Sequence, residues 1–401
     1  MKSLLRNVRR THFARIVVAG VVAALSLLLL SVTTVGPKSI ASFEAQNIWR
    51  GCEENRKECL AEKIADIAIE RGTRPAFLIV ENLYTRFSSE EGLCFTLTDR
   101  IGDRVAQRVQ EYETLRLDPE SIFCNFGFYQ AYARELVLLA KDIAIGRKLC
   151  EFVEEKIGKV SSGGAIECFR GFGHALPFLS PDFGNASRMA LFGIRECEKN
   201  ASKSSWRDAC ISGVFSRLGF AEFNNLYGLT AQKTDPLSLC DDVPTTYYSR
   251  CKGNFKRSII LDDESLSLEK AIGGFKATFS GLDTDDFSAI AFTWGYDTTG
   301  KIAFQSDPSE IIRVCAYENV PLYRSCIEGA ILSIAKNGIP MKQHLQLHSF
   351  CELIDRDPNL FLIECPGTQP LSYLRTFFSP TQFEKICRMF GHSLTECAQV
   401  E

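Results

Sequence analysis

The residues best suited to acid–base or metal chemistry in this chain are His174, His344 and His348. His344 and His348 stand four positions apart in a stretch typical of a helix, so both imidazoles lie on one face, with Cys351 nearby. Such a group is able to hold zinc, but the glutamate of a His-Glu-x-x-His motif is missing, and oxidation of Cys351 leaves only the two histidines. We therefore favour a solvated or partly buried helix face and expect no metal.

His174 lies in a stretch rich in glycine and phenylalanine, between Gly173 and Ala175. A histidine there could act as a general base or bind a ligand on the concave face of a helical array. We favour the alternative, a helix residue hydrogen-bonded to a neighbouring loop. The sequence has no Gly-x-Ser-x-Gly elbow, phosphate-binding glycine loop or dinucleotide fingerprint, so we expect no cofactor and no catalysis.

Cysteine is the residue type that says most about this chain, with 16 copies in 401 residues. The number is even and high for a reduced intracellular protein. No Cys-x-x-Cys occurs, which argues against a structural metal site and against a disulfide-exchange motif. The cysteine content therefore predicts disulfide bonds and an oxidising compartment.

A short phrase recurs along the chain, in which a cysteine is followed two or three residues later by glycine and then by an apolar stretch. Its copies begin at Cys124, Cys168, Cys210, Cys251, Cys326 and Cys365, and Phe292-Thr293-Trp294-Gly295 has the same form without the cysteine. The copies are roughly 40 residues apart, a period that suits a two-helix repeat. The region 252–310 is polar, rich in turn residues and without cysteines, and we interpret it as a repeat that lost its disulfide or as an insertion.

Each of the later phrases has a cysteine upstream, late in an amphipathic stretch, which predicts a disulfide across the turn between successive repeats. The order of the cysteines leaves other connectivities open, but we expect the pairs Cys150–Cys168, Cys197–Cys210, Cys240–Cys251, Cys315–Cys326, Cys351–Cys365 and Cys387–Cys397. Nearer the N-terminus, Cys52 and Cys59 form one expected pair and Cys94 and Cys124 the other.

This layout, with a cysteine late in one helix and another opening the next helix just before a glycine, resembles the cysteine-rich helical-hairpin repeat proteins of the tetratricopeptide superfamily. The resemblance covers residues 94–401. It implies a curved scaffold that binds peptides or proteins.

The N-terminus is typical of an export signal. Residues 16–35 are uncharged, and at ~1.5 Å per residue they are just long enough to cross a bilayer. The basic residues within 1–15 should remain cytoplasmic, so the rest of the chain lies beyond the cytoplasmic membrane. A cleaved signal peptide, which would release the protein by secretion, is the alternative.

The sequence thus predicts an all-α protein, an α-solenoid-like array of disulfide-linked helical hairpins after an N-terminal transmembrane helix. We divide it into a cytoplasmic segment (1–15), a membrane anchor (16–35), an N-terminal helical region (36–93) and the repeats (94–401). Beyond the basic N-terminus the chain is mildly acidic, which argues against nucleic acid as a partner.

Three functions remain open at this point. We favour a tethered scaffold that binds a protein or peptide, because helical repeat arrays more often bind than catalyse. The alternatives are an enzyme or metal-binding protein that uses His174, His344 or His348, and a purely structural envelope component.

Overall fold

The structure is a computed structural model, and it describes residues 37–87, 93–230, 237–258, 267–278, 282–302, 308–338, 342–360, 363–378 and 380–400. Throughout these ranges the ordered elements are helices and no strand occurs, which confirms the all-α prediction. The predicted cytoplasmic segment and membrane anchor lie outside the described residues. Among the described residues, no helix combines the length and apolarity needed to cross a bilayer.

The α-helices are mostly of moderate length, and some of the connections between them contain one turn of 3-10 helix. In chain order the α-helices are α2 (Pro37–Arg50), α3 (Arg56–Arg71), α4 (Thr73–Phe87), α5 (Leu93–Arg108), α6 (Gly127–Ala140), α7 (Ile143–Ile157), α8 (Gly163–Ala175), α9 (Ala186–Asn200), α10 (Ser204–Phe223), α11 (Thr245–Ser258), α12 (Leu268–Thr278), α13 (Thr284–Ile302), α14 (Pro308–Cys315), α15 (Val320–Asn337), α16 (Gln343–Ile354), α17 (Thr368–Phe377), α18 (Pro380–Met389) and α19 (Leu394–Gln399). The 3-10 turns are η1 (Tyr112–Thr114), η2 (Pro119–Ile122), η3 (Leu176–Leu179) and η4 (Ser238–Asp242).

Several helices begin where the sequence supplies a capping residue. The side chain of Asp142 accepts a hydrogen bond from the backbone N–H of Ala144 at 2.8 Å, and that of Asn185 accepts one from Arg188 at 3.0 Å. Asn319 caps α15 in the same way, just before a proline in the first turn. Because the first N–H groups of a helix have no partner within the helix, these side chains fix where α7, α9 and α15 start.

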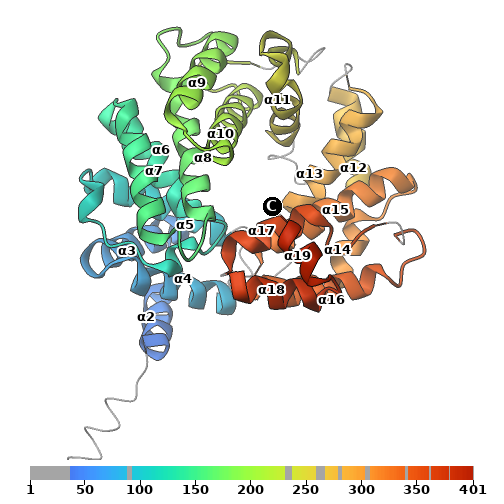
Figure 1. Ribbon diagram of the computed structural model, residues 1–401, viewed down its shortest axis with the longest axis horizontal. Coiled ribbons are helices and arrows are strands. Elements are labelled where there is room, and N and C mark those ends of the chain that lie inside the picture. Colours follow the sequence, from blue (N-terminus) through green and yellow to red (C-terminus); the bar gives the residue numbers. More distant parts are fainter. Residues whose placement is uncertain are drawn as a thin grey trace, which may run out of the picture.

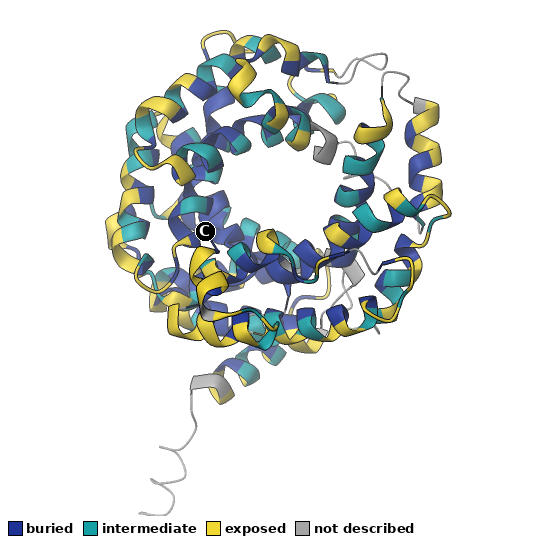
Figure 2. Cartoon of the chain, turned by 45° about the vertical axis from the view of Figure 1, so that its right-hand side comes forward, coloured by how far each residue is buried: buried dark blue, intermediate teal, exposed yellow. Residues whose placement is uncertain are grey.

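The helices form a ring (Figures 1 and 2). One succession, which we call the ring helices, runs round it with each member contacting the next, in the order α5, α6, α8, α10, α11, α13, α15 and α17. Flanking helices pack against them: α7 on α6 and α8, α9 on α10, α12 on α13, α14 on α13 and α15, α16 on α15 and α18 on α17. Exposed residues gather toward the outer margin of the ring (Figure 2).

The ring closes through contacts between residues that are far apart in the sequence. The rings of Phe126, before α6, and Phe377, at the end of α17, stack with centroids 4.8 Å apart. Beside them the hydroxyl of Ser161 donates a hydrogen bond to the carbonyl oxygen of Thr376. The sequence pattern predicts an α-solenoid-like array and gives no sign of this closure.

Eight disulfides join the cysteines of the chain, with Cα–Cα separations of 5.3 to 5.9 Å. The bonded pairs are Cys52–Cys59, Cys94–Cys124, Cys150–Cys168, Cys197–Cys210, Cys240–Cys251, Cys315–Cys326, Cys351–Cys365 and Cys387–Cys397, the same pairs that the sequence pattern suggests. Three of them link a flanking helix to the next ring helix, α7 to α8, α9 to α10 and α14 to α15. The predicted disulfide bonding is thus supported, and it places a covalent link between the two helices of each of these hairpins.

Glycines of the recurring phrase allow neighbouring ring helices to touch backbone to backbone. A Cβ atom on Gly171 would collide with the carbonyl oxygen of Gln130 in α6, and one on Gly213 with that of Arg170 in α8. Gly295 and Gly329 stand in the same relation between α13 and α15. The cysteine-free copy of the phrase in α13 is therefore packed like the others, which favours a repeat that lost its disulfide over an insertion.

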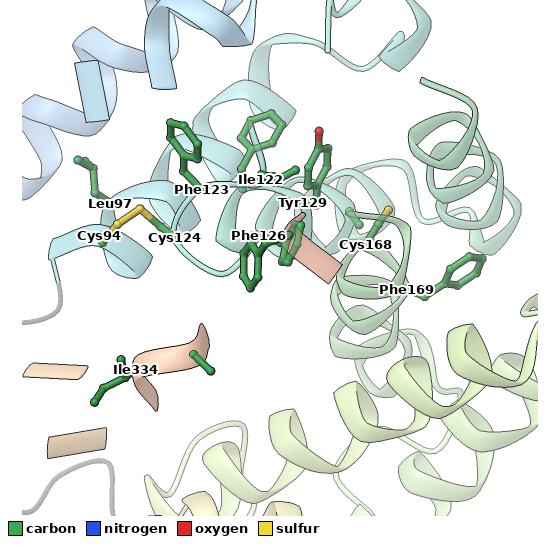
Figure 3. Close-up of a cluster of buried hydrophobic side chains, with 14 of the residues drawn as sticks. Cys94, Leu97, Ile122, Phe123, Cys124, Phe126, Tyr129, Cys168, Phe169 and Ile334 are labelled. Carbon is green, nitrogen blue, oxygen red and sulfur yellow. A yellow bond between two sulfur atoms is a disulfide. The ribbon is translucent and has the colours of Figure 1, made fainter. Parts of the chain in front are cut away.

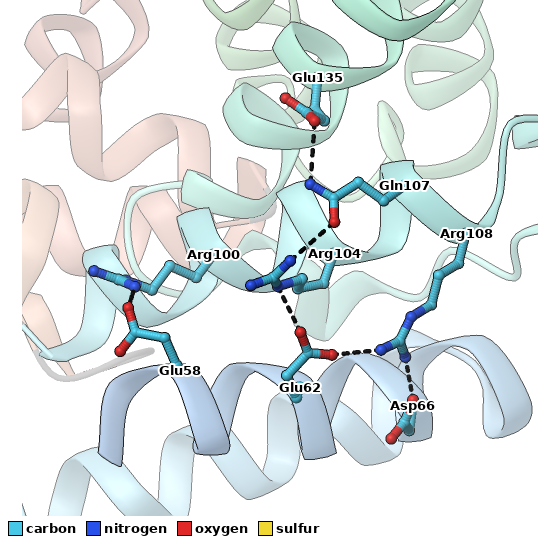
Figure 4. A network of polar contacts seen from close by, with 8 residues as sticks. All are labelled: Glu58, Glu62, Asp66, Arg100, Arg104, Gln107, Arg108 and Glu135. Carbon is cyan, nitrogen blue, oxygen red and sulfur yellow. Dashed lines mark hydrogen bonds and ion pairs between the residues drawn. The ribbon is translucent and has the colours of Figure 1, made fainter. Parts of the chain in front are cut away.

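A second set of contacts fastens α3 to α5 through charge. Arg100, Arg104 and Arg108, one turn apart on α5, form ion pairs with acidic residues of α3, and Gln107 extends the network to Glu135 of α6 (Figure 4). These side chains are substantially exposed. Ion pairs in such positions each contribute less than about 1 kcal/mol, so the network sets the pairing of the helices more than their stability.

The apolar core follows the ring. Around the Cys94–Cys124 disulfide, Leu97, Phe123 and Phe126 belong to a buried cluster that also includes Ile334 of α15 (Figure 3). This packing between early and late helices adds to the closure of the ring, because burial of apolar side chains is the main favourable term in folding.

The glycine contacts give a direct prediction. Gly213→Ala should lower the free energy of unfolding by about 3 kcal/mol, because the added methyl group meets the backbone of α8 and the two helices must separate. Gly253 occupies the matching place in its own copy of the phrase but has open space around it, so Gly253→Ala should stabilise α11 by up to about 1 kcal/mol. Chemical denaturation of both variants provides the measurement. Equal effects would contradict the proposed close approach of α8 and α10.

Candidate functional site

The structure places the three candidate histidines in two separate regions. His174 lies on α8, whereas His344 and His348 lie on α16, in a different part of the ring (Figure 1). No single site therefore uses all three of them.

The environment of His174 is the most unusual one on the ring helices. Its Nε2 lies 3.0 Å from the hydroxyl of Ser216 on α10, and that hydroxyl donates a hydrogen bond to the carbonyl oxygen of Gly213 at 3.1 Å. Because the hydroxyl hydrogen is used there, Nε2 of His174 is the donor to Ser216. Nδ1 is then an acceptor, buried and without a hydrogen-bond partner among the described residues.

Burial and three nearby cations keep His174 neutral. Burial lowers the pKa of the imidazole well below its usual value, and the charges of Arg134, Arg217 and Arg170 lower it further. An imidazole that acts as a general base becomes positively charged when it takes a proton, and these arginines oppose that charge. The sequence-based interpretation of His174 as a hydrogen-bonded helix residue thus fits the geometry better than a catalytic role.

Charged residues surround this histidine in a polar cluster that spans several ring helices. We use the name polar cluster for Asp99 and Asp103 of α5, Gln130 and Arg134 of α6, Glu167, Arg170 and His174 of α8, and Ser216 of α10. The cluster joins α5, α6, α8 and α10 by side-chain contacts.

Arg134 holds the α5 side of the polar cluster together. Its guanidinium donates to Asp99 at 3.2 Å and to Asp103 at 2.7 Å. Burial raises the pKa of Asp103 to about 6, against the opposing effect of the Arg134 charge. Burial works against the charge of Arg134 as well, but the two carboxylates outweigh it and raise the pKa of the guanidinium.

Glu167 holds the α8 side. Its side chain is 4% exposed, and one carboxylate oxygen accepts hydrogen bonds at 2.7 Å from both Gln130 and Arg170. Arg170 also lies within electrostatic reach of Tyr373 on α17 and Tyr296 on α13. The ammonium group of Lys336 on α15 stacks on Tyr373, 3.7 Å from the ring centroid. Polar side chains of α8, α13, α15 and α17 thus come near one another, which the spacing of these residues in the sequence does not indicate.

An aromatic surface adjoins the polar cluster through Arg217. Phe178, Phe183 and Tyr227, which we call the aromatic trio, have ring centroids 4.7 to 6.3 Å apart. Phe183 is 53% exposed and Tyr227 is 49% exposed, a large share for side chains of this size. Arg217 lies 5.5 Å from the centroid of Phe178 and within electrostatic reach of Tyr227.

Arg217 differs from the other arginines of the site in having no carboxylate partner among the described residues. Its Nε is buried without a hydrogen-bond acceptor. Burial lowers the pKa of the guanidinium, and the charge of Arg134 lowers it further. An incoming acidic or carbonyl group near this arginine would therefore relieve an unfavourable arrangement of charge.

No known protein family, curated protein or solved structure matches this chain. The chemistry of the site therefore rests on its geometry.

The two histidines of α16 are packed as helix residues, and Nδ1 of His344 is buried without a hydrogen-bond partner among the described residues. The ring of His344 packs edge-on against Phe378, with centroids 5.3 Å apart, and burial lowers its pKa. Nδ1 of His348 lies 3.8 Å from the Glu352 carboxylate, one turn further along α16. Cys351 is bonded to Cys365 and supplies no thiolate, and the described part of the chain contains no group of three or more metal-ligating side chains.

Sequence reasoning missed Arg217, the aromatic trio and the charged members of the polar cluster. One signal was present in the sequence, because Glu167 and Arg170 interrupt an otherwise apolar, glycine-rich stretch at a spacing that places both on one helix face. The trio has no such signal, since Phe183 and Tyr227 lie in two different turns.

The buried pair of Glu167 and Arg170 provides a test of the polar cluster. Glu167→Ala should lower the free energy of unfolding by about 3–5 kcal/mol, because Arg170 is left as a buried cation without its carboxylate. The matched control is Glu155→Ala, which removes a 70% exposed partner of Lys156 and should cost less than about 1 kcal/mol. Equal losses in denaturant titrations would show that the cluster is effectively solvated.

Proposed function

We propose that this chain is a binding scaffold on the outer side of the cytoplasmic membrane, tethered by residues 16–35, and that it binds a protein or peptide at the aromatic trio and Arg217. The disulfides support a location in an oxidising compartment. The membrane tether and the similarity to tetratricopeptide scaffolds stay predictions from the sequence.

The observation that carries the proposal is the exposure of Phe183 and Tyr227 beside Arg217, which forms no ion pair with a carboxylate among the described residues. Aromatic residues and arginine dominate the energetically important positions of protein interfaces. A small molecule would favour an enclosed pocket that buries most of its surface, whereas the aromatic trio is open. A polypeptide partner with an apolar or aromatic side chain and a nearby acidic or carbonyl group fits this surface best.

Catalysis by His174 receives less support. Its pKa is lowered, and no carboxylate orients its Nδ1 among the described residues. In nucleophile–base pairs the base is usually oriented by such a third group. A purely structural role remains the main rival to binding, and it requires that the aromatic trio make no contact with any partner.

Photocrosslinking separates these two roles. With Phe183 replaced by the photoreactive p-benzoylphenylalanine, irradiation of producing cells should yield one discrete adduct, because the side chain lies at the proposed interface. The same replacement at Leu345, which is 51% exposed on α16, is the matched control and should yield none. Tyr227→Ala should reduce the yield of the adduct roughly tenfold, the effect of losing a strong interface contact. Identical patterns at both positions, or no effect of Tyr227→Ala, would contradict the proposed binding surface.

A further inference from the structure

The first described helix, α2, carries an apolar surface that nothing in the ring covers. Its Ala41 and Ala45 are buried on the side that packs against α4. On the opposite side Ile40 is 46% exposed and Phe43 is 67% exposed. In both views of the molecule α2 projects from the margin of the ring (Figures 1 and 2).

The character of this exposed face changes along the helix. Ile40, Phe43, Asn47 and Arg50 follow one another at three- and four-residue spacing, so they form a single stripe. The first two are apolar and the last two are polar. The apolar part of the stripe is therefore confined to the end of α2 that lies next to residues 16–35.

The connection to that segment is short. The uncharged run ends at residue 35, and α2 begins at Pro37. At ~1.5 Å rise per residue, Phe43 lies only about 9 Å along the helix from its first residue. If residues 16–35 cross a bilayer, the covalent link places Ile40 and Phe43 at the level of the lipid head groups and the ends of the acyl chains.

We propose that Ile40 and Phe43 are immersed in the outer membrane–water interface, and that lipid is what covers the exposed face of α2. This inference rests on the tether in the proposed function. Lipid is favoured over a protein partner because the exposed residues nearest residue 35 are apolar and those farther along α2 are polar. This order is expected for a helix that leaves a membrane. Phenylalanine and isoleucine partition into this region, and the polar Asn47 and Arg50 stay in water.

A fixed orientation of the ring follows from this contact. Glu44 of α2 pairs with Arg71 of α3 at 2.8 Å, and Ala41 and Ala45 pack on the side of α4, so α2 is joined to the body by contacts with two helices. With the first turns of α2 at the membrane surface, the packing of α2 on α3 and α4 sets how the ring is presented to the membrane.

Lipid quenching of tryptophan fluorescence tests the proposal on the full chain. Phe43→Trp and the matched control Leu345→Trp are each reconstituted in phosphatidylcholine–phosphatidylglycerol vesicles whose acyl chains are brominated close to the head groups. Both replaced side chains are exposed, so neither change disturbs the core. Relative to the parent chain, the fluorescence added by Trp at position 43 should fall about twofold or more in brominated lipid, whereas that added at position 345 should be unchanged.

Extraction with alkaline carbonate, run in parallel, distinguishes the possible failures. Resistance to extraction together with quenching at position 43 supports the proposal. Resistance without quenching overturns the interfacial contact and leaves the tether intact. Release by carbonate removes the tether and the interfacial contact together. If the protein instead self-associates in detergent as its concentration rises, and Trp at position 43 becomes shielded from solvent, the exposed face of α2 belongs to a contact with a second copy. That result would overturn the assignment to lipid.

Discussion

The disulfide between a flanking helix and the next ring helix is the interaction on which much of this architecture depends. Cys150–Cys168, Cys197–Cys210 and Cys315–Cys326 each join the two helices of one hairpin. By restricting the unfolded chain, each such bond contributes about 3 kcal/mol in the loop-entropy description. In a repeat array, stability is a sum over units and their junctions, so a covalent link within each hairpin fixes the unit that the neighbouring contacts then assemble.

Close contact between the ring helices is a second constraint, and it shapes the polar cluster. Gly171 and Gly213 allow the backbones of α6, α8 and α10 to approach closely. Little room is then left between the helices for long side chains beside these contacts. Glu167, Arg170 and His174 are placed there, and their burial is compensated by hydrogen bonds to Gln130 and Ser216. Arg217 is the exception, since its charge is compensated mainly by aromatic rings and a tyrosine hydroxyl. This difference is why we propose the surface beside it as the place where a partner binds.

Much of the local structure could be predicted from the sequence, because its signals are local. Proline marks the start of α14 and α18, and the cysteine order suggests the pairs that the structure contains. The contact between Phe126 and Phe377 could not be predicted in this way, because it joins distant parts of the chain and has no periodic pattern. The same holds for the aromatic trio, whose members come from η3 and two separate turns. His174 was identified as a residue of interest, but its neighbours Arg134 and Arg217 come from other helices and were not.

Disulfide mapping of the protein tests the central claim most directly. The protein is alkylated and digested without reduction, and linked peptides are identified by mass spectrometry. Links between Cys150 and Cys168, Cys197 and Cys210, and Cys315 and Cys326 are the predicted result. Alkylation of these cysteines as free thiols, or a link such as Cys168 to Cys210 between different hairpins, would contradict a ring built from hairpins that are each closed by their own disulfide.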